Sequence, residues 1–122
     1  MTATQLYYFP GQKATVFLET KDGYTRADAS SPFDGYAVPV ITRVVFPDLS
    51  LAAGFPKPMI KLDTGLYFFQ FTLPTGGSSV GSYLVDVTYN VPNTSYFTTK
   101  LYQLIVTAPF GNFGVTVGTA GV

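Results

Sequence analysis

Two similar motifs, each a glycine turn followed by a tyrosine, constrain the fold of this chain more than any other feature. They are Thr64-Gly65-Leu66-Tyr67 and Val80-Gly81-Ser82-Tyr83, about sixteen residues apart, and each begins a long run of alternating apolar residues. In each run we expect the glycine to make the turn and the tyrosine to be the first side chain that points inward. The motifs therefore predict two long antiparallel strands of an all-β domain.

The rest of the chain continues this alternation, and no stretch keeps the 3.6-residue period of a helix. In residues 13–20 the apolar positions 14, 16 and 18 form one side of the run and the polar positions 13, 15 and 19 belong to the other, which indicates a half-buried strand. Three later strands are expected to point toward the core with Val40, Thr42, Val44 and Phe46, then Tyr67, Phe69, Phe71 and Leu73, and then Tyr83, Val85, Val87 and Tyr89. Together with short strands near residues 4–9 and 59–62 and a long one near 97–107, the pattern predicts a Greek-key β-sandwich of about seven antiparallel strands.

Composition indicates a protein that packs against other proteins. Of the 122 residues, 47% are hydrophobic and only 11% are charged, and seven basic residues balance seven acidic ones. A surface with few charges and no net charge is poorly protected from association. We therefore expect a homo-oligomer or a chain bound within a larger lattice. The alternative is a monomer with a large aromatic core.

Charge and residue usage argue against several other classes of protein. A neutral chain without a basic cluster is not expected to bind nucleic acid. The sequence contains no cysteine and no histidine, so disulfides and thiolate metal sites are impossible. Residues 1–9 lack the features of a signal peptide, and the uncharged stretch 101–122 contains a proline and several glycines, so we expect no membrane contact.

No side chains in the sequence form a convincing catalytic or metal site. Asp22, Asp28 and Asp34 belong to one loop, but their spacing is not that of a calcium loop, and solvated loop charges are the simpler interpretation. Neither a Ser-x-x-Lys nor a Gly-x-Ser-x-Gly motif occurs, so we expect no enzyme and no cofactor. A sugar-stacking platform is a weaker alternative because tryptophan is absent. Its candidate residues are Tyr7, Tyr8, Tyr24, Tyr36, Tyr96 and Tyr102.

Residues 108–122 differ in kind from the rest of the chain, because they carry no charge and are rich in glycine. Alone in water, such a segment gains too little from its apolar groups to offset the entropy of ordering its glycines. We therefore predict a sandwich over residues 1–107 and an extended arm over residues 108–122, which docks on a neighbouring subunit or adds a strand to its sheet. The alternative is a frayed terminus without a role.

Six residues are the candidates for contacts with a partner. The arm is expected to anchor through its apolar side chains, and the strand that begins at residue 66 carries two further apolar residues on the face turned away from the core. These candidates are Phe110, Phe113, Val115, Val117, Leu66 and Phe68.

The stretch Gly81-Ser82-Tyr83-Leu84-Val85 resembles the corner that opens strand F of immunoglobulin-like domains. Tyr83 would then be the corner tyrosine, and Val85 stands where antibody domains keep a cysteine. The missing cysteine and tryptophan point to the cysteine-free bacterial and phage relatives. Residues 9–18 and 64–74 resemble such modules as well. Similar patterns occur in macroglobulin-like and bacterial immunoglobulin-like repeats and in virion proteins of tailed phages.

This resemblance implies a small structural protein of a tailed-bacteriophage virion, such as a head decoration or fibre protein or a neck or tail accessory protein. Its partners would be capsid, neck or tail proteins, and it would assemble in the host cytoplasm. The alternative function is that of a bacterial cell-surface or glycan-binding immunoglobulin-like module. Both functions depend on adhesion through edges, loops and tails rather than on catalysis.

Overall fold

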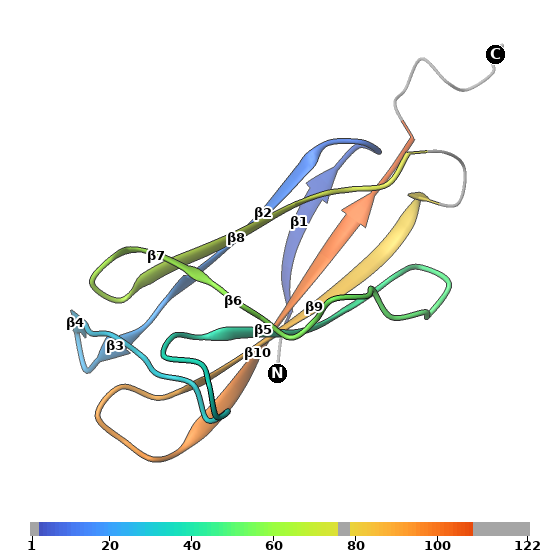
Figure 1. Ribbon diagram of the computed structural model, residues 1–122. Helices are drawn as coiled ribbons and strands as arrows, with labels where there is room; N and C mark the ends of the chain where they lie inside the picture. Colours follow the sequence, from blue (N-terminus) through green and yellow to red (C-terminus); the bar gives the residue numbers. More distant parts are fainter. Residues whose placement is uncertain (1–2, 76–78, 109–122) are drawn as a thin grey trace, which may run out of the picture.

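The computed structural model describes residues 3–75 and 79–108, which form an all-β fold (Figure 1). This confirms the all-β class expected from the alternating sequence, although the described part has ten strands rather than about seven. Three of the strands have only two residues each. In chain order the strands are β1 (Thr4–Tyr8), β2 (Lys13–Glu19), β3 (Lys21–Asp22), β4 (Thr25–Arg26), β5 (Val40–Val45), β6 (Lys57–Pro58), β7 (Ile60–Asp63), β8 (Leu66–Thr72), β9 (Gly81–Asn90) and β10 (Phe97–Val106).

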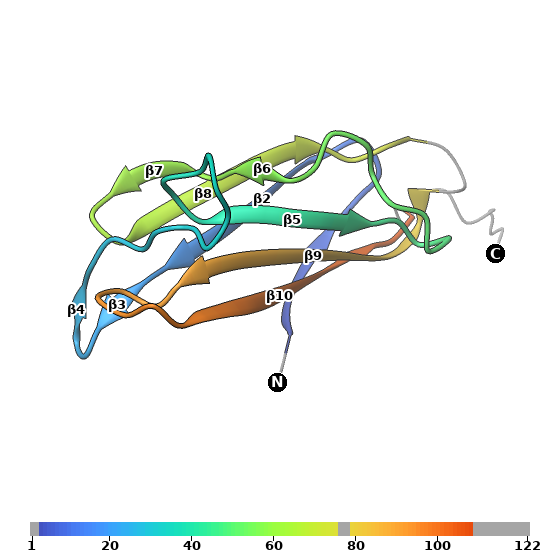
Figure 2. The same ribbon diagram turned by 60° about the horizontal axis from the view of Figure 1, so that its bottom comes forward.

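Two sheets lie face to face as separate layers (Figure 2). The five-stranded sheet has the order β1-β10-β9-β5-β6, the three-stranded sheet has the order β2-β8-β7, and β3 and β4 pair in a small hairpin. β1 runs parallel to β10, and the other pairs of strands are antiparallel. One edge of the three-stranded sheet is β2, and the other is β7.

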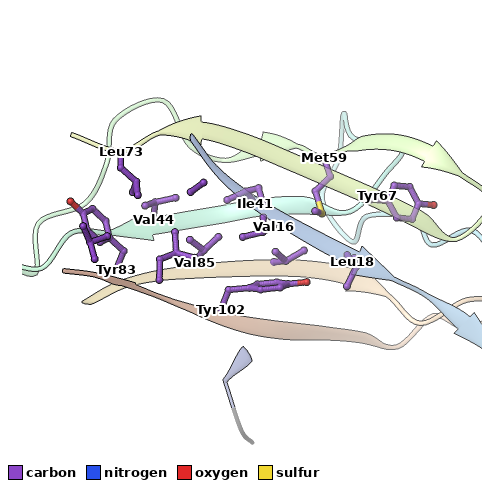
Figure 3. Close-up of a cluster of buried hydrophobic side chains, with 14 residues drawn as sticks. Val16, Leu18, Ile41, Val44, Met59, Tyr67, Leu73, Tyr83, Val85 and Tyr102 are labelled. Atoms are coloured by element: carbon purple, nitrogen blue, oxygen red, sulfur yellow. The ribbon is translucent and has the colours of Figure 1, made fainter. Parts of the chain in front are cut away.

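The core fills the space between the two sheets with side chains from both (Figure 3). From the three-stranded sheet, Ala14, Val16 and Leu18 are fully buried, as the alternation of β2 predicts. From the five-stranded sheet, alternate residues of β9 and β10 meet them, because successive side chains of a strand point to opposite faces. The buried residues that these two strands supply are Tyr83, Val85, Val87, Tyr102, Leu104 and Val106.

Both motifs place the tyrosine as predicted, since Tyr67 and Tyr83 are buried near the start of β8 and β9, but Gly81 is itself the first residue of β9 and not part of a turn. The Tyr83 hydroxyl donates a hydrogen bond to the Ser79 carbonyl oxygen at 2.8 Å. Gly65 has a φ of +67° and is so closely packed that a Cβ there would lie 2.6 Å from the Thr20 carbonyl oxygen. Glycine is therefore required at this turn for both its backbone conformation and its lack of a side chain.

Two tyrosine hydroxyls from the five-stranded sheet bind the backbone of β2 at its outer edge. The Tyr8 hydroxyl accepts a hydrogen bond from the Thr15 N–H at 3.0 Å and lies 3.1 Å from the Thr15 carbonyl oxygen, to which it donates. The Tyr102 hydroxyl donates to the Phe17 carbonyl oxygen. These bonds satisfy backbone groups that point away from β8, so they connect the two sheets and cover part of an exposed edge.

The inward face predicted for residues 38–46 is wrong in part. The pairing of β5 with β9 shifts between Ile41 and Arg43, and an extra residue at such a bulge reverses the alternation of side chains. As a result Ile41 belongs to the core, whereas the Thr42 hydroxyl donates to the Asp86 carbonyl oxygen at 2.9 Å. Val40 is buried but pairs with Thr88 on the face opposite the core.

We predict that Tyr83→Phe lowers the free energy of unfolding by about 1 kcal/mol, because the substitution removes one buried hydrogen bond and leaves the ring in place. Chemical denaturation measures the loss. Tyr24→Phe is the matched control, since the Tyr24 side chain is fully exposed. Equal stabilities of the two variants would show that the Tyr83 hydroxyl does not stabilise the turn before β9.

A second pair of substitutions separates close packing from backbone conformation at the turn before β8. Gly65 and Gly23 have the same φ of +67°, but a Cβ at Gly23 would meet nothing within 4 Å. Gly23→Ala should therefore cost about 1 kcal/mol through conformation alone. Gly65→Ala should cost at least about 2 kcal/mol more, since backbone atoms must move. Thermal unfolding of the two variants tests this difference, and similar melting temperatures would contradict it.

Candidate interaction surface

A row of apolar side chains crosses the outer face of the three-stranded sheet. Phe17 of β2 pairs with Phe68 of β8, which in turn pairs with Ile60 of β7. The two rings are 6.4 Å apart between centroids. Phe17 and Ile60 are 54% and 55% exposed. The opposite face of β2 nevertheless belongs to the core, and so does part of β8, the neighbour of β7.

Leu66 extends this row toward the turn between β7 and β8, and Leu62 lies beside it at the register shift between Lys61 and Asp63, where it pairs with no residue of β8. Leu62 is 53% exposed, and Leu66 is half-buried between its two cross-strand partners, Glu19 of β2 and Asp63 of β7. We call these five apolar residues the outer patch. It consists of Phe17, Phe68, Ile60, Leu62 and Leu66. Contiguous exposed apolar side chains on one flat face are typical of a surface that a partner covers.

Polar residues flank the outer patch, and they form hydrogen bonds or ion pairs with one another. Toward the start of β2, the Gln70 amide donates to the Thr15 hydroxyl at 2.9 Å, so the adjoining row is satisfied within the sheet. Glu19 lies 3.6 Å from Lys21 in an exposed ion pair. A partner for this surface therefore needs apolar side chains and little charge.

The outer face of the five-stranded sheet has a different character, because polar contacts run across its strands. Gln5 donates to Gln103 at 3.1 Å, and Gln103 donates to the Ser82 hydroxyl at 3.2 Å. Arg43 of β5 pairs with Asp86 of β9. Apolar side chains on this face are interrupted by these ladders, so it offers a less continuous apolar surface than the outer patch does.

Of the six predicted partner contacts, two are placed by the structure. Leu66 and Phe68 lie next to one another on the outer face of β8, as expected. The other four, Phe110, Phe113, Val115 and Val117, fall in residues 109–122, outside the described part. Sequence reasoning missed Phe17, Ile60 and Leu62. The available signal was a phenylalanine at an otherwise polar position of β2.

The three loop carboxylates that share a segment of sequence do not meet in space. Asp28 accepts hydrogen bonds from Lys61 Nζ at 2.7 Å and from the Gly65 N–H at 2.9 Å. The Lys61 contact and then the Gly65 N–H hold the pKa of Asp28 below its usual value. Asp22 instead accepts from the Asn93 amide at 2.6 Å. Within residues 3–75 and 79–108 no group of three or more acidic side chains could hold a metal ion.

The six tyrosines proposed for a sugar platform are spread over several elements. Tyr102 is buried in the core, where desolvation raises its pKa, and Tyr8 binds the edge of β2. Tyr24 and Tyr96 are exposed and belong to the β3–β4 hairpin and the β9–β10 loop, which the Asn93–Asp22 hydrogen bond connects. These two are therefore the tyrosines with a face open to a ligand at that end of the molecule.

Comparison of the chain with protein-family models, with curated proteins and with solved structures gave no match. In the described ranges there is also no helix with the length and apolar character needed to cross a bilayer. What the side chains of the outer patch can do is bury apolar area against a partner.

We predict that Phe17→Ala costs about 1 kcal/mol or less in unfolding free energy, because half of this side chain is exposed. Leu18→Ala, one residue along β2, should cost about 2 to 5 kcal/mol, since it leaves a cavity in the core. Denaturation with urea compares the two. If Phe17→Ala destabilises as much as Leu18→Ala, Phe17 serves the fold and not a partner.

Proposed function

We propose that this protein is a non-catalytic structural component of a tailed-phage virion, built as an immunoglobulin-like Greek-key sandwich that adheres to other virion proteins. The observation that carries the adhesive role is the outer patch, an apolar row on a sheet whose other face forms the core. The virion assignment rests on the resemblance described for residues 9–18, 64–74 and 81–85. Its site of action would be the assembled particle.

Three features of the fold support the immunoglobulin-like part of this proposal. The two sheets have the orders β1-β10-β9-β5-β6 and β2-β8-β7, so neighbours in the sheets are often distant in sequence, as Greek-key connections require. β1 joins β10 in parallel. The Tyr83 hydroxyl binds the Ser79 carbonyl oxygen, four residues upstream, in the same sense as the hydrogen bond of a tyrosine corner.

Energetics support adhesion through the outer patch. Covering a half-exposed aliphatic or aromatic side chain stabilises a complex by about 1 kcal/mol, so five of them provide the centre of an ordinary interface. Such interfaces bury about 800 Å² on each partner. In a particle the same contact is repeated by symmetry, and simultaneous contacts multiply a modest affinity. The low charge of the chain removes a repulsion that would oppose this packing.

A second candidate function is a cell-surface or glycan-binding module. The observation that favours it is the exposure of Tyr24 and Tyr96 on two loops that a 2.6 Å hydrogen bond connects. Tyrosine rings at such positions can stack on sugar rings. This function would use the loop end of the molecule, whereas the virion function would use the outer patch.

The location of the protein tests the proposal and separates it from the second candidate. Antibodies against the purified chain are applied to particles and to cells from a culture that produces it, and labelling is examined by electron microscopy. We predict label at regular positions on virions. Label on the cell surface with none on particles would contradict the virion function and favour the surface module.

A further inference from the structure

We propose that the outer patch of one copy is the receptor for residues 109–122 of a second copy. This inference rests on the proposed adhesive function and names the partner that covers the patch. The two surfaces match in chemistry. The patch presents apolar side chains from three adjacent strands, and the segment carries no charge and offers Phe110, Phe113, Val115 and Val117.

The point where the chain leaves the sandwich favours a second copy over the same one. The Thr107 N–H donates to the Tyr8 carbonyl oxygen at 3.1 Å, so β10 ends beside the end of β1, close to where β2 begins (Figure 1). Phe17 lies four residues along β2 from Lys13, about 14 Å away, and in the other layer, about 10 Å across.

Chain length then limits what the segment can reach. Phe110 is three residues beyond Thr107, so its Cα lies at most about 11 Å from that of Thr107, which falls short of the Cα of Phe17 in its own copy. The whole of residues 109–122 can extend over about 45 Å, which is ample to cross to a neighbour. Docking on a second copy frees the segment from this limit, so all four of its apolar side chains can enter the patch.

The edge strand β7 offers backbone hydrogen-bonding groups next to the patch. Among the described strands it pairs with β8 alone, and all four of its residues are exposed. A segment laid over the patch must satisfy its own backbone N–H and C=O groups, which an edge strand can do by pairing. Val115-Thr116-Val117 has the alternation of a strand, so its two valines can lie on one face and contact Ile60 of the patch.

Light scattering of the full-length chain and two kinds of variant tests the proposal. Phe17→Lys changes the patch and keeps the segment, while Phe110→Ser/Phe113→Ser changes the segment and keeps the patch. Phe97→Lys is the control, because Phe97 is 65% exposed on another face. We expect the wild type and the control to be oligomeric. Each variant should have the 13.2 kDa mass of one chain at concentrations where the wild type is assembled.

Mixing the two variants is the decisive step. The intact segment of the Phe17→Lys chain can dock on the intact patch of the Phe110→Ser/Phe113→Ser chain, so the mixture should form a species of twice the single-chain mass. The mixed pair is held by one segment–patch contact, whereas copies of the wild type are held by several. We therefore expect the mixture to be half assembled at a protein concentration at least about tenfold higher than the wild type requires. Ile60→Lys provides a second patch variant if Phe17→Lys alters the circular dichroism spectrum.

Four results would overturn the proposal. The first is a monomeric wild type. The second is a segment variant that assembles like the wild type, which would point to face-to-face packing of two patches and leave the adhesive function intact. The third is a pair of monomeric variants that do not combine on mixing. If the patch variants alone assemble like the wild type, the patch is not the contact surface, and the adhesive role proposed for it fails as well.

Discussion

The rest of the structure depends on the hydrogen bonds that hold the edge of β2 against the five-stranded sheet. Tyr8 and Tyr102 bind the backbone of Thr15 and Phe17 through their hydroxyls. Shifting a strand by one residue exchanges its two faces, so bonds at fixed backbone positions also fix which side chains point inward. With β2 held in this register, Val16 and Leu18 fill the core and Phe17 faces outward.

This constraint connects the fold to the surface on which the proposed function rests. The hydroxyls satisfy edge groups of β2 from inside the molecule, so this edge is partly closed to other strands. The opposite edge, β7, has no such cover among the described strands. Between the two edges lie the Phe17–Phe68 pair and Ile60, and across the molecule the other outer face carries polar ladders. The two outer faces are thus unequal, and the apolar one borders the open edge.

Much of the fold could be predicted from the sequence because turns and strands are indicated by residues that are close together in the chain. A glycine turn followed by alternating residues placed Tyr67 and Tyr83 in the core, and no contact from elsewhere was needed to infer it. The bulge between Ile41 and Arg43 could not be predicted in this way, because it depends on how β5 meets β9. The alternation of residues within one strand gives no sign that an extra residue will be accommodated when that strand pairs with another.

The candidate surface was predictable only in part, for the same reason. Leu66 and Phe68 followed from the alternation of one strand. Their neighbours Phe17 and Ile60 come from strands distant in sequence, and only the register of the sheet places the three residues in a row. The composition of residues 108–122 indicated a segment that needs a partner, but composition does not say which surface receives it.

We expect the outer patch to be covered when the protein is assembled. Hydroxyl-radical footprinting read out by mass spectrometry tests it most directly, because Phe17 and Phe97 are the same residue type with similar exposure in the single chain, 54% and 65%. At concentrations where the protein is assembled, the account predicts that Phe17 is oxidised much more slowly than Phe97, and that the two rates converge on dilution. Equal oxidation of Phe17 and Phe97 in the assembled protein would contradict it.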